Sequence, residues 1–170
     1  VYGIEQGSSN IGIRLGENLT MEDCLYGMML ESANEVCVAV AEHISGSVDA
    51  FVELMNQKAT SLGCTNTHFV NPHGLYDENH YTTAREMATI TEYALTMPYF
   101  TDVTSQTYYT QPPTNMTSEE RTVTTTNRML LSYDDEYYTY ATGVKTGSLN
   151  ESGYCISATA TYDGYSYLVV

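Results

Sequence analysis

Two short motifs carry residue types that serine enzymes use in acyl transfer: Ser32-Ala33-Asn34 and Lys145-Thr146-Gly147. A Ser-x-Asn tripeptide alone is often no more than a helix cap, and a lone Lys-Thr-Gly is equally unspecific. In this order, the two resemble the second and third elements of the set S-x-x-K, S-D-N and K-T-G. Their joint presence favours chemistry in which a serine hydroxyl forms a covalent acyl intermediate.

The first element of that set is absent. The chain has two lysines, and the residues three positions before Lys58 and Lys145 are Met55 and Thr142, so no S-x-x-K occurs. Without it the chain has no activated nucleophile, because a serine hydroxyl needs a neighbouring base. We therefore interpret the chain as a natural, engineered or proteolytic fragment that is inactive alone. If the chain were instead a degenerate relative of such enzymes, loss of the segment with S-x-x-K would leave a hole in its core.

The net charge of the chain limits the classes of molecule that it can bind. The 170 residues include 21 acidic and six basic ones, a net charge of -15 at pH 7. Such a charge repels phosphate backbones and anionic lipid, which predicts no nucleic acid partner. No apolar run approaches the roughly 18 residues that a membrane helix needs. Val1–Gly7 contains neither Met nor an export signal, so we expect the chain to begin mid-protein.

The histidines and cysteines do not predict a metal site or any other cofactor. His68 and His73 frame a loop without a third ligand at suitable spacing, and we interpret them as hydrogen-bond partners that hold it. The cysteines form no C-x-x-C pair and stand in apolar surroundings, which favours small buried side chains over disulfides. They are Cys24, Cys37, Cys64 and Cys155.

Four helices are predicted to position the first motif. Thr20 offers an N-cap before two acidic residues, and Thr83-Ala-Arg-Glu86 has the pattern of a capping box. The helical pattern breaks at Glu31–Asn34, which places Ser32 between two helices. The predicted helices span about Met21–Leu30, Val36 to near Gly46, Val48 to Gly63 and Ala84–Met97, with a long ordered loop at Thr65–Tyr81.

Antiparallel strands are predicted to carry the second motif. Threonine, tyrosine and β-branched residues become frequent after Phe100, and Asp163-Gly164 is a strong hairpin signal. Helices followed by strands indicate an α+β fold, with Ser32 and Lys145 facing each other across the junction. The predicted strands are Thr107–Thr110, Arg121–Thr126, Ala141–Thr146, Tyr154–Thr161 and Tyr165–Val170, and Tyr133–Tyr140 is interpreted as an acidic, aromatic surface turn.

Beyond the two motifs, successive blocks resemble the penicillin-binding serine D-Ala-D-Ala carboxypeptidases, or low-molecular-mass penicillin-binding proteins. The resemblance runs from about Leu19 to Val170 in family order. It implies a β-lactamase/transpeptidase-like fold, with a partial catalytic domain at 1–170 that is incomplete on its N-terminal side. Its parts are helical at 19–100 and mainly loops and antiparallel strands at 101–170. The blocks are Leu19–Leu30, Ala41–Phe51, Asn66–Leu75, His80–Arg85, Asn127–Arg128 and Gly143–Cys155.

What the resemblance implies is removal of the terminal D-Ala from peptidoglycan stem peptides through an acyl-enzyme. β-Lactam antibiotics would be further ligands, and a missing N-terminal segment with S-x-x-K would be a partner. The enzyme would act outside the cytoplasm after export. The implied roles are a proton relay for Ser32, positioning for Asn34, fixed positive charge for Lys145, carboxylate binding for Thr146 and Arg128, close substrate approach for Gly147, and an oxyanion-binding N–H for Ser148.

Three alternatives stay open at this point. A β-lactamase shares the three-element layout, but Ala33 stands where S-D-N has Asp. A DD-endopeptidase would use the same residues on cross-linked peptides. The third alternative is a non-catalytic module that binds peptidoglycan or simply survives as a stable fragment. For Arg128 itself, the alternative is an ordinary surface salt bridge in an acidic protein.

Overall fold

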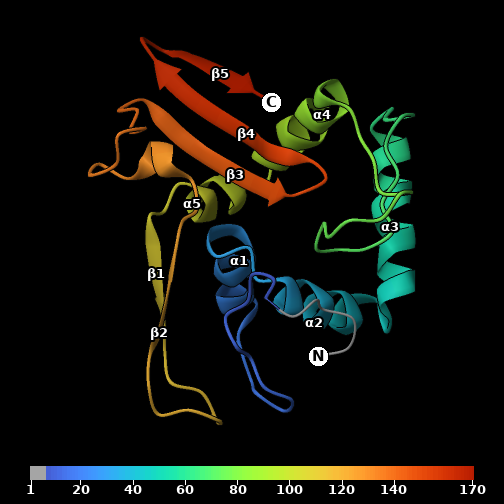
Figure 1. Cartoon of the computed structure of the whole chain (residues 1–170), viewed down its shortest axis with the longest axis vertical. Helices are drawn as coiled ribbons and strands as arrows, with labels where there is room; N and C mark the ends of the chain where they lie inside the picture. The colour runs from blue at the N-terminus through green and yellow to red at the C-terminus, as the bar shows by residue number, and fades with distance from the viewer. Residues whose placement is uncertain (1–6) are drawn as a thin grey trace.

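Helices and an antiparallel sheet make up the computed structural model, which describes residues 7–170 (Figure 1). The predicted α+β order is confirmed, while the predicted start within a longer protein rests on residues 1–6, which lie outside the described part. The helices are α1 (Met21–Leu30), α2 (Asn34–Ser45), α3 (Val48–Ser61), α4 (Ala84–Leu95), α5 (Phe100–Thr104) and the 3-10 helix η1 (Arg128–Leu130). The strands are β1 (Tyr108–Gln111), β2 (Arg121–Thr124), β3 (Ala141–Leu149), β4 (Gly153–Tyr162) and β5 (Tyr165–Val169).

Side-chain caps fix where the helices begin. Thr20 and Asp23 form a complete capping box at α1, because each side chain accepts the other's backbone N–H. At α4 the predicted box is half wrong: Thr83 Oγ1 accepts from Glu86 N at 3.2 Å, but the Glu86 carboxylate binds the loop after α3. It accepts from Thr65 N (3.0 Å), Asn66 N (2.9 Å) and Thr67 Oγ1 (2.6 Å).

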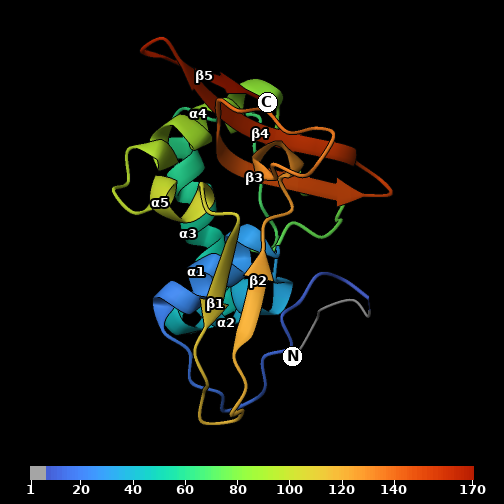
Figure 2. The same ribbon diagram turned by 90° about the vertical axis from the view of Figure 1, so that its left-hand side faces the viewer.

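The sheet has the strand order β3-β4-β5, and both pairs are antiparallel. Asp163 and Gly164 both have positive φ, 49° and 78°, as a two-residue type I′ turn requires, so the predicted β4–β5 hairpin is confirmed. A separate two-stranded hairpin, β1–β2, runs alongside α1 (Figure 2). Strand β3 therefore lies at one edge of the larger sheet and β5 at the other.

One face of the larger sheet is turned toward the helices. A Cβ added to Gly143 would meet Thr104 Oγ1 of α5 at 3.2 Å, so α5 lies against that face. Lys145, two positions on, donates from Nζ to the hydroxyl of Ser32 between α1 and α2, so its side chain also points to the helices. The sheet thus directs Lys145 toward the helical part, as the sequence predicts.

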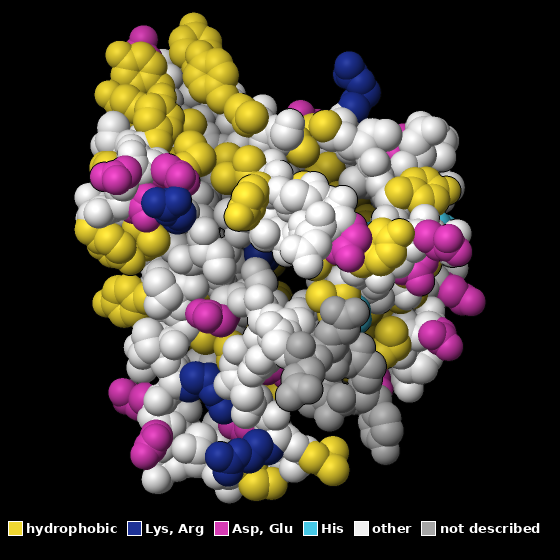
Figure 3. Space-filling model, viewed as in Figure 1, with side chains coloured by type: hydrophobic (Ala, Val, Ile, Leu, Met, Phe, Trp, Pro, Cys, Tyr) yellow, Lys and Arg dark blue, Asp and Glu magenta, His cyan; other side chains and the backbone are white. Residues whose placement is uncertain are grey.

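The opposite face exposes aromatic side chains. Along the β4–β5 pair, Tyr162 lies opposite Tyr165 and Ala160 opposite Tyr167, which places these residues on one face. Tyr165 is 67% exposed, and Val169, four positions further along β5 and on the same face, is 63% exposed. Hydrophobic side chains protrude over the part of the sheet that carries the β4–β5 turn (Figure 3). We call this surface the tyrosine face.

The core lies where α1 meets α5 and the β1–β2 hairpin. Leu30, Val103 and Val123 are almost fully buried together, and the rings of Tyr26 and Tyr109 stack at a centroid distance of 3.9 Å. A second cluster consists of Ala33, just before α2, with Val36 and Val40 of α2, and Cys24 and Met28 of α1 pack against it. Ser32 lies between Leu30 of the first cluster and Ala33 of the second, so buried residues stand close to it on both sides.

The structure corrects several sequence predictions. Helix α5 and η1 were not predicted, because they are five and three residues long and α5 contains two β-branched threonines. Of the cysteines, Cys64 is buried but Cys155 is exposed, so uniform burial is wrong. Among residues 7–170, no helix combines the length and apolarity that crossing a bilayer requires.

Candidate active site

Ser32 lies in the tight connection between α1 and α2. Its φ of 58° is left-handed, a conformation that costs energy for a residue other than glycine. Ala33 N donates to Gly27 O at 3.1 Å, and the fully buried Ala33 side chain packs in the α1–α2 cluster. These contacts hold the connection, and the strain at Ser32 is of the kind found at functional sites.

Lys145 meets Ser32 across the junction between helices and sheet. Its Nζ donates to Ser32 Oγ and, at 2.7 Å, to the carbonyl oxygen of Thr146. The two residues are 113 positions apart in the chain, so the fold alone brings the two motifs together. The prediction that they face each other is confirmed.

Burial lowers the pKa of Lys145, because the charged ammonium loses solvent. The thiol of Cys37 on α2 lies close enough to interact with this ammonium. Burial raises the pKa of the Cys37 thiol to about 11. No carboxylate of the described residues forms an ion pair with Lys145. The ammonium is therefore a cation held mainly by neutral oxygens.

Asn34 and Glu35 open α2 and tie it to the preceding loop. Asn34 N donates to Ser9 O at 3.0 Å, and Glu35 Oε1 accepts from Ile11 N at 2.7 Å and Gly12 N at 3.0 Å. Both side chains are buried, Asn34 to 7% exposure and Glu35 to 4%. These hydrogen bonds hold the end of the Ser-x-Asn motif in place. Glu35 was not predicted from the sequence to belong to the site, although this residue directly follows the motif.

Thr146 and Gly147 continue β3 past Lys145. Thr146 Oγ1 lies 2.5 Å from Thr126 Oγ1, a contact that the sequence analysis did not foresee. Gly147 has an ordinary extended backbone, and an added Cβ would touch only Cys155 Cβ, at 3.7 Å. The protein itself therefore does not require glycine there, which leaves close approach by another molecule as a reason for it.

Ser148 is exposed on β3, opposite Tyr154 of β4. Because β3 is an edge strand, its other side has no strand partner among the described residues. An extended peptide can pair with such an edge. Thr146, Gly147 and Ser148 thus line an edge that begins beside Ser32.

Arg128 is placed differently from Lys145. Its Nε donates to Asp134 at 2.8 Å and its Nη1 to Glu136 at 2.7 Å, and its side chain is 53% exposed. These carboxylates raise the pKa of Arg128 further above its ordinary value. Both belong to the acidic, aromatic turn interpreted as a surface feature. The guanidinium is therefore already paired within its own loop.

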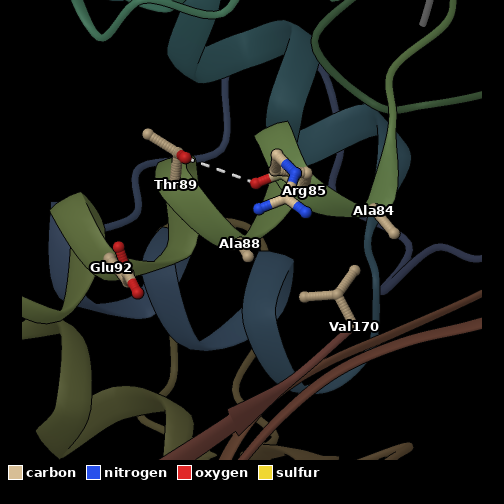
Figure 4. A pocket seen from close by; sticks show the side chains of 6 residues that line it. All are labelled: Ala84, Arg85, Ala88, Thr89, Glu92 and Val170. Atoms are coloured by element: carbon tan, nitrogen blue, oxygen red, sulfur yellow. Dashed lines mark hydrogen bonds between the residues drawn. The ribbon is translucent and has the colours of Figure 1, made fainter.

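The two loop histidines form the hydrogen bonds expected of them. His68 Nδ1 lies 2.7 Å from Asn79 O, and His73 Nδ1 accepts from Leu75 N at 3.2 Å. A hollow of about 410 Å³ lies elsewhere, between α4 and Val170 at the end of the sheet (Figure 4). Its lining contains none of the motif residues, so the candidate site is the junction and not this hollow.

Comparison with known proteins gives this arrangement a family. The sequence profile of peptidase S11, D-alanyl-D-alanine carboxypeptidase, matches residues 2–170. The chain is 38% identical over 159 residues to the D-alanyl-D-alanine carboxypeptidase DacF of Bacillus subtilis, covering 94% of this chain and 39% of that protein. It therefore spans well under half the length of this relative.

Solved structures agree with the sequence relatives. The Streptomyces K15 DD-transpeptidase superposes with a TM-score of 0.86 at 31% identity, over 95% of this chain and 63% of the other. Penicillin-binding protein 5 of Haemophilus influenzae gives 0.82 at 32% identity, over 96% and 46%. These matches confirm the predicted transpeptidase-like α+β fold. The chain belongs to the peptidase S11 family of D-alanyl-D-alanine carboxypeptidases.

Proposed function

We propose that this chain supplies the second and third elements of a serine D-Ala-D-Ala carboxypeptidase that trims peptidoglycan stem peptides through an acyl-enzyme. The observation that carries the proposal is the hydrogen bond from Lys145 Nζ to Ser32 Oγ. It joins the Ser-x-Asn and Lys-Thr-Gly motifs at one point, as a shared catalytic centre requires. Family membership supports the reaction class.

Lys145 and Ser32 help to deliver a proton to the departing amine. An ammonium beside a hydroxyl favours the deprotonated forms of its neighbours, so Lys145 makes Ser32 a better proton relay. The nucleophilic serine gives up its proton as it attacks the carbonyl carbon, and Ser32 passes a proton to the D-Ala nitrogen as the C–N bond breaks. Asn34, one position beyond the buried Ala33, orients the relay and the substrate backbone by its side-chain amide.

The edge of β3 binds the substrate. The Thr146 hydroxyl receives the terminal carboxylate, and Gly147 lets the peptide backbone approach. The Ser148 N–H contributes one oxyanion donor, and the other comes from the N–H of the nucleophile. The exposure of Ser148 and the unpaired edge of β3 among the described residues support this assignment.

Arg128 takes a second part in carboxylate recognition. Its guanidinium has a donor, Nη2, for which no partner is found among the described residues, and its side chain is 53% exposed. A charge-assisted bond from this donor would attract the anionic end of the substrate. Asp134 and Glu136 hold the fork in place and compete with the substrate for its charge.

The nucleophile comes from a segment that carries S-x-x-K, packed against residues 1–170 as one catalytic domain. The active enzyme works outside the cytoplasm, where its peptidoglycan substrate lies, and β-lactams acylate the same serine. A DD-endopeptidase activity would use the same residues, but nothing in the site favours the longer cross-linked substrate.

A labelling experiment tests the proposal. The chain alone, incubated with a fluorescent penicillin, should show no covalent label, because it has no activated hydroxyl. Adding a segment with S-x-x-K should give label on the serine of that segment. Lys145→Ala should abolish the restored label, whereas Lys58→Ala, at an exposed lysine on α3, should not. Specific labelling of a serine within the 170 residues would refute the assignment.

A further inference from the structure

The contact between Thr126 and Thr146 carries an inference about substrate recognition. We propose that Thr126 is a positioning residue that aims the Thr146 hydroxyl at the carboxylate of the substrate. This rests on the proposed role of Thr146. The two hydroxyl oxygens lie 2.5 Å apart, within hydrogen-bonding distance.

The backbone around Thr126 is fixed from both sides. Thr126 N donates to Leu30 O at 3.2 Å, which ties it to the last residue of α1, next to the Ser32 connection. Before it, Thr125 N donates to Thr107 O at 2.9 Å. After it, Asn127 is 1% exposed, and its side chain accepts from Met129 N at 3.2 Å. The Thr126 side chain therefore projects from an anchored segment.

The direction of the hydrogen bond follows from the chemistry of the bound state. A hydroxyl has one proton to donate and lone pairs to accept with. A carboxylate only accepts hydrogen bonds, so the Thr146 hydroxyl must donate its hydrogen bond to the substrate. Its oxygen is then free to accept, and Thr126 supplies that proton. A hydroxyl that accepts one hydrogen bond donates a stronger one, which makes the pair a short cooperative chain.

This pair differs from an ordinary cross-strand threonine pair. Such a pair exists in the molecule: Thr110 and Thr122 face each other in the β1–β2 hairpin, with oxygens 3.2 Å apart. Thr126 lies beyond the end of β2, and its partner belongs to the Lys-Thr-Gly motif in the other sheet. Thr126 is also exposed, so it stands at the surface beside the motif. The hairpin pair provides a matched control.

The test measures kcat/KM in the enzyme made complete with its S-x-x-K segment. Two substrates are compared, a D-Ala-D-Ala peptide and the same peptide with its terminal carboxylate amidated. Thr126→Val should lower kcat/KM on the carboxylate peptide about three- to tenfold, the usual range for one net hydrogen bond, and leave the amide unchanged. The loss should appear in KM, because the carboxylate is bound equally before and during the reaction.

Three further variants isolate the hydroxyl. Thr126→Ser keeps the hydroxyl and should stay within about twofold of the wild type. Thr126→Ala removes the hydroxyl without putting a methyl group in its place, and should cause the same loss of kcat/KM on the carboxylate peptide. Thr122→Val breaks the hairpin pair and should change neither substrate. An equal loss on both substrates in Thr126→Ala would mean that the residue serves the fold, which overturns the inference.

A double variant separates this inference from the function on which it rests. If Thr146→Val lowers kcat/KM equally on both substrates, the proposed role of Thr146 fails, and that of Thr126 fails with it. If Thr146→Val is selective but Thr126→Val is not, only the inference fails. If both hold, Thr126→Val combined with Thr146→Val should lose no more than Thr146→Val alone, because a positioning residue acts through its partner. Additive losses would count against it.

Discussion

The Ser32–Lys145 junction and the Arg128 loop place two cations in opposite circumstances. Lys145 donates to a hydroxyl and a carbonyl oxygen and forms no ion pair with a carboxylate of the described residues. Arg128 is half exposed and bound to two carboxylates. Arg14, Lys58 and Arg85 also form no ion pair among the described residues, but all three are exposed, whereas Lys145 is partly buried. The fold thus leaves the charge of Lys145 unpaired, as its proposed catalytic role requires, whereas Arg128 is paired within its own loop.

The sharpest test of this comparison removes the junction cation. In the complete enzyme, Lys145→Ala should lower kcat/KM about a hundred- to a thousandfold, the range for losing a preorganised charge at the reacting atoms. The loss should be equal for carboxylate and amide substrates, because Lys145 acts at the relay. Lys145→Arg should not restore activity, since a planar fork does not replace a compact ammonium between Ser32 Oγ and Thr146 O. Full activity in Lys145→Ala would remove the distinction between the two regions.

The next test asks whether Arg128 also reaches the substrate. Arg128→Ala should lower kcat/KM on the carboxylate peptide about ten- to a hundredfold, and Arg128→Lys less, because it keeps the charge but loses the fork. Asp134→Asn with Glu136→Gln frees the guanidinium and should raise kcat/KM on that peptide only. If Arg128→Ala lowers kcat/KM equally on the carboxylate and amide substrates, Arg128 supports only its loop. Of the two cations, Lys145 alone would then act in the reaction.

The smallest expected effect is a pH dependence of stability. Burial lowers the pKa of Lys145 in the folded chain, so between that value and about 10.4, its value when unfolded, the unfolded chain binds more protons. The contribution of Lys145 to stability therefore grows as pH rises through this window and is complete above it. The free energy of unfolding of the wild type relative to Lys145→Met should rise from pH 7 to pH 10.5.

Urea denaturation of the wild type and of Lys145→Met measures this trend. The titration of other groups cancels in the difference between their free energies of unfolding. Lys58→Met, at an exposed lysine, is the control. A difference that stays constant with pH for Lys145→Met would mean that its ammonium is as well solvated as a surface lysine.

Local signals accounted for most of the fold. The Thr20 cap, the break at Glu31–Asn34 and the Asp163-Gly164 turn each depend on residues a few positions apart, so the sequence displays them directly. Helix α5 has no such signal, because its five residues are helical through packing against β3 and α1. Tertiary contacts there override a weak local preference.

The candidate site was predictable to the extent that its motifs are contiguous. Ser32 and Lys145 met as expected, whereas Thr126 went unnoticed, since its contact with Thr146 joins two side chains twenty positions apart. The partners of Arg128 could have been anticipated, because Asp134 and Glu136 stand six and eight positions on, in a run already recognised as acidic. Pairing within a loop was weighed there only as the alternative.

The tyrosine face has a consequence for the colloidal behaviour of the protein. The edge strand β5, Tyr-Ser-Tyr-Leu-Val, contains no lysine or proline to discourage pairing with another edge. At neutral pH the net charge of -15 keeps molecules apart, but this repulsion vanishes near the isoelectric point of about 4.3 and is screened by salt. Acidification should therefore bring these aromatic edges together, so clear solutions are favoured by neutral pH and low ionic strength.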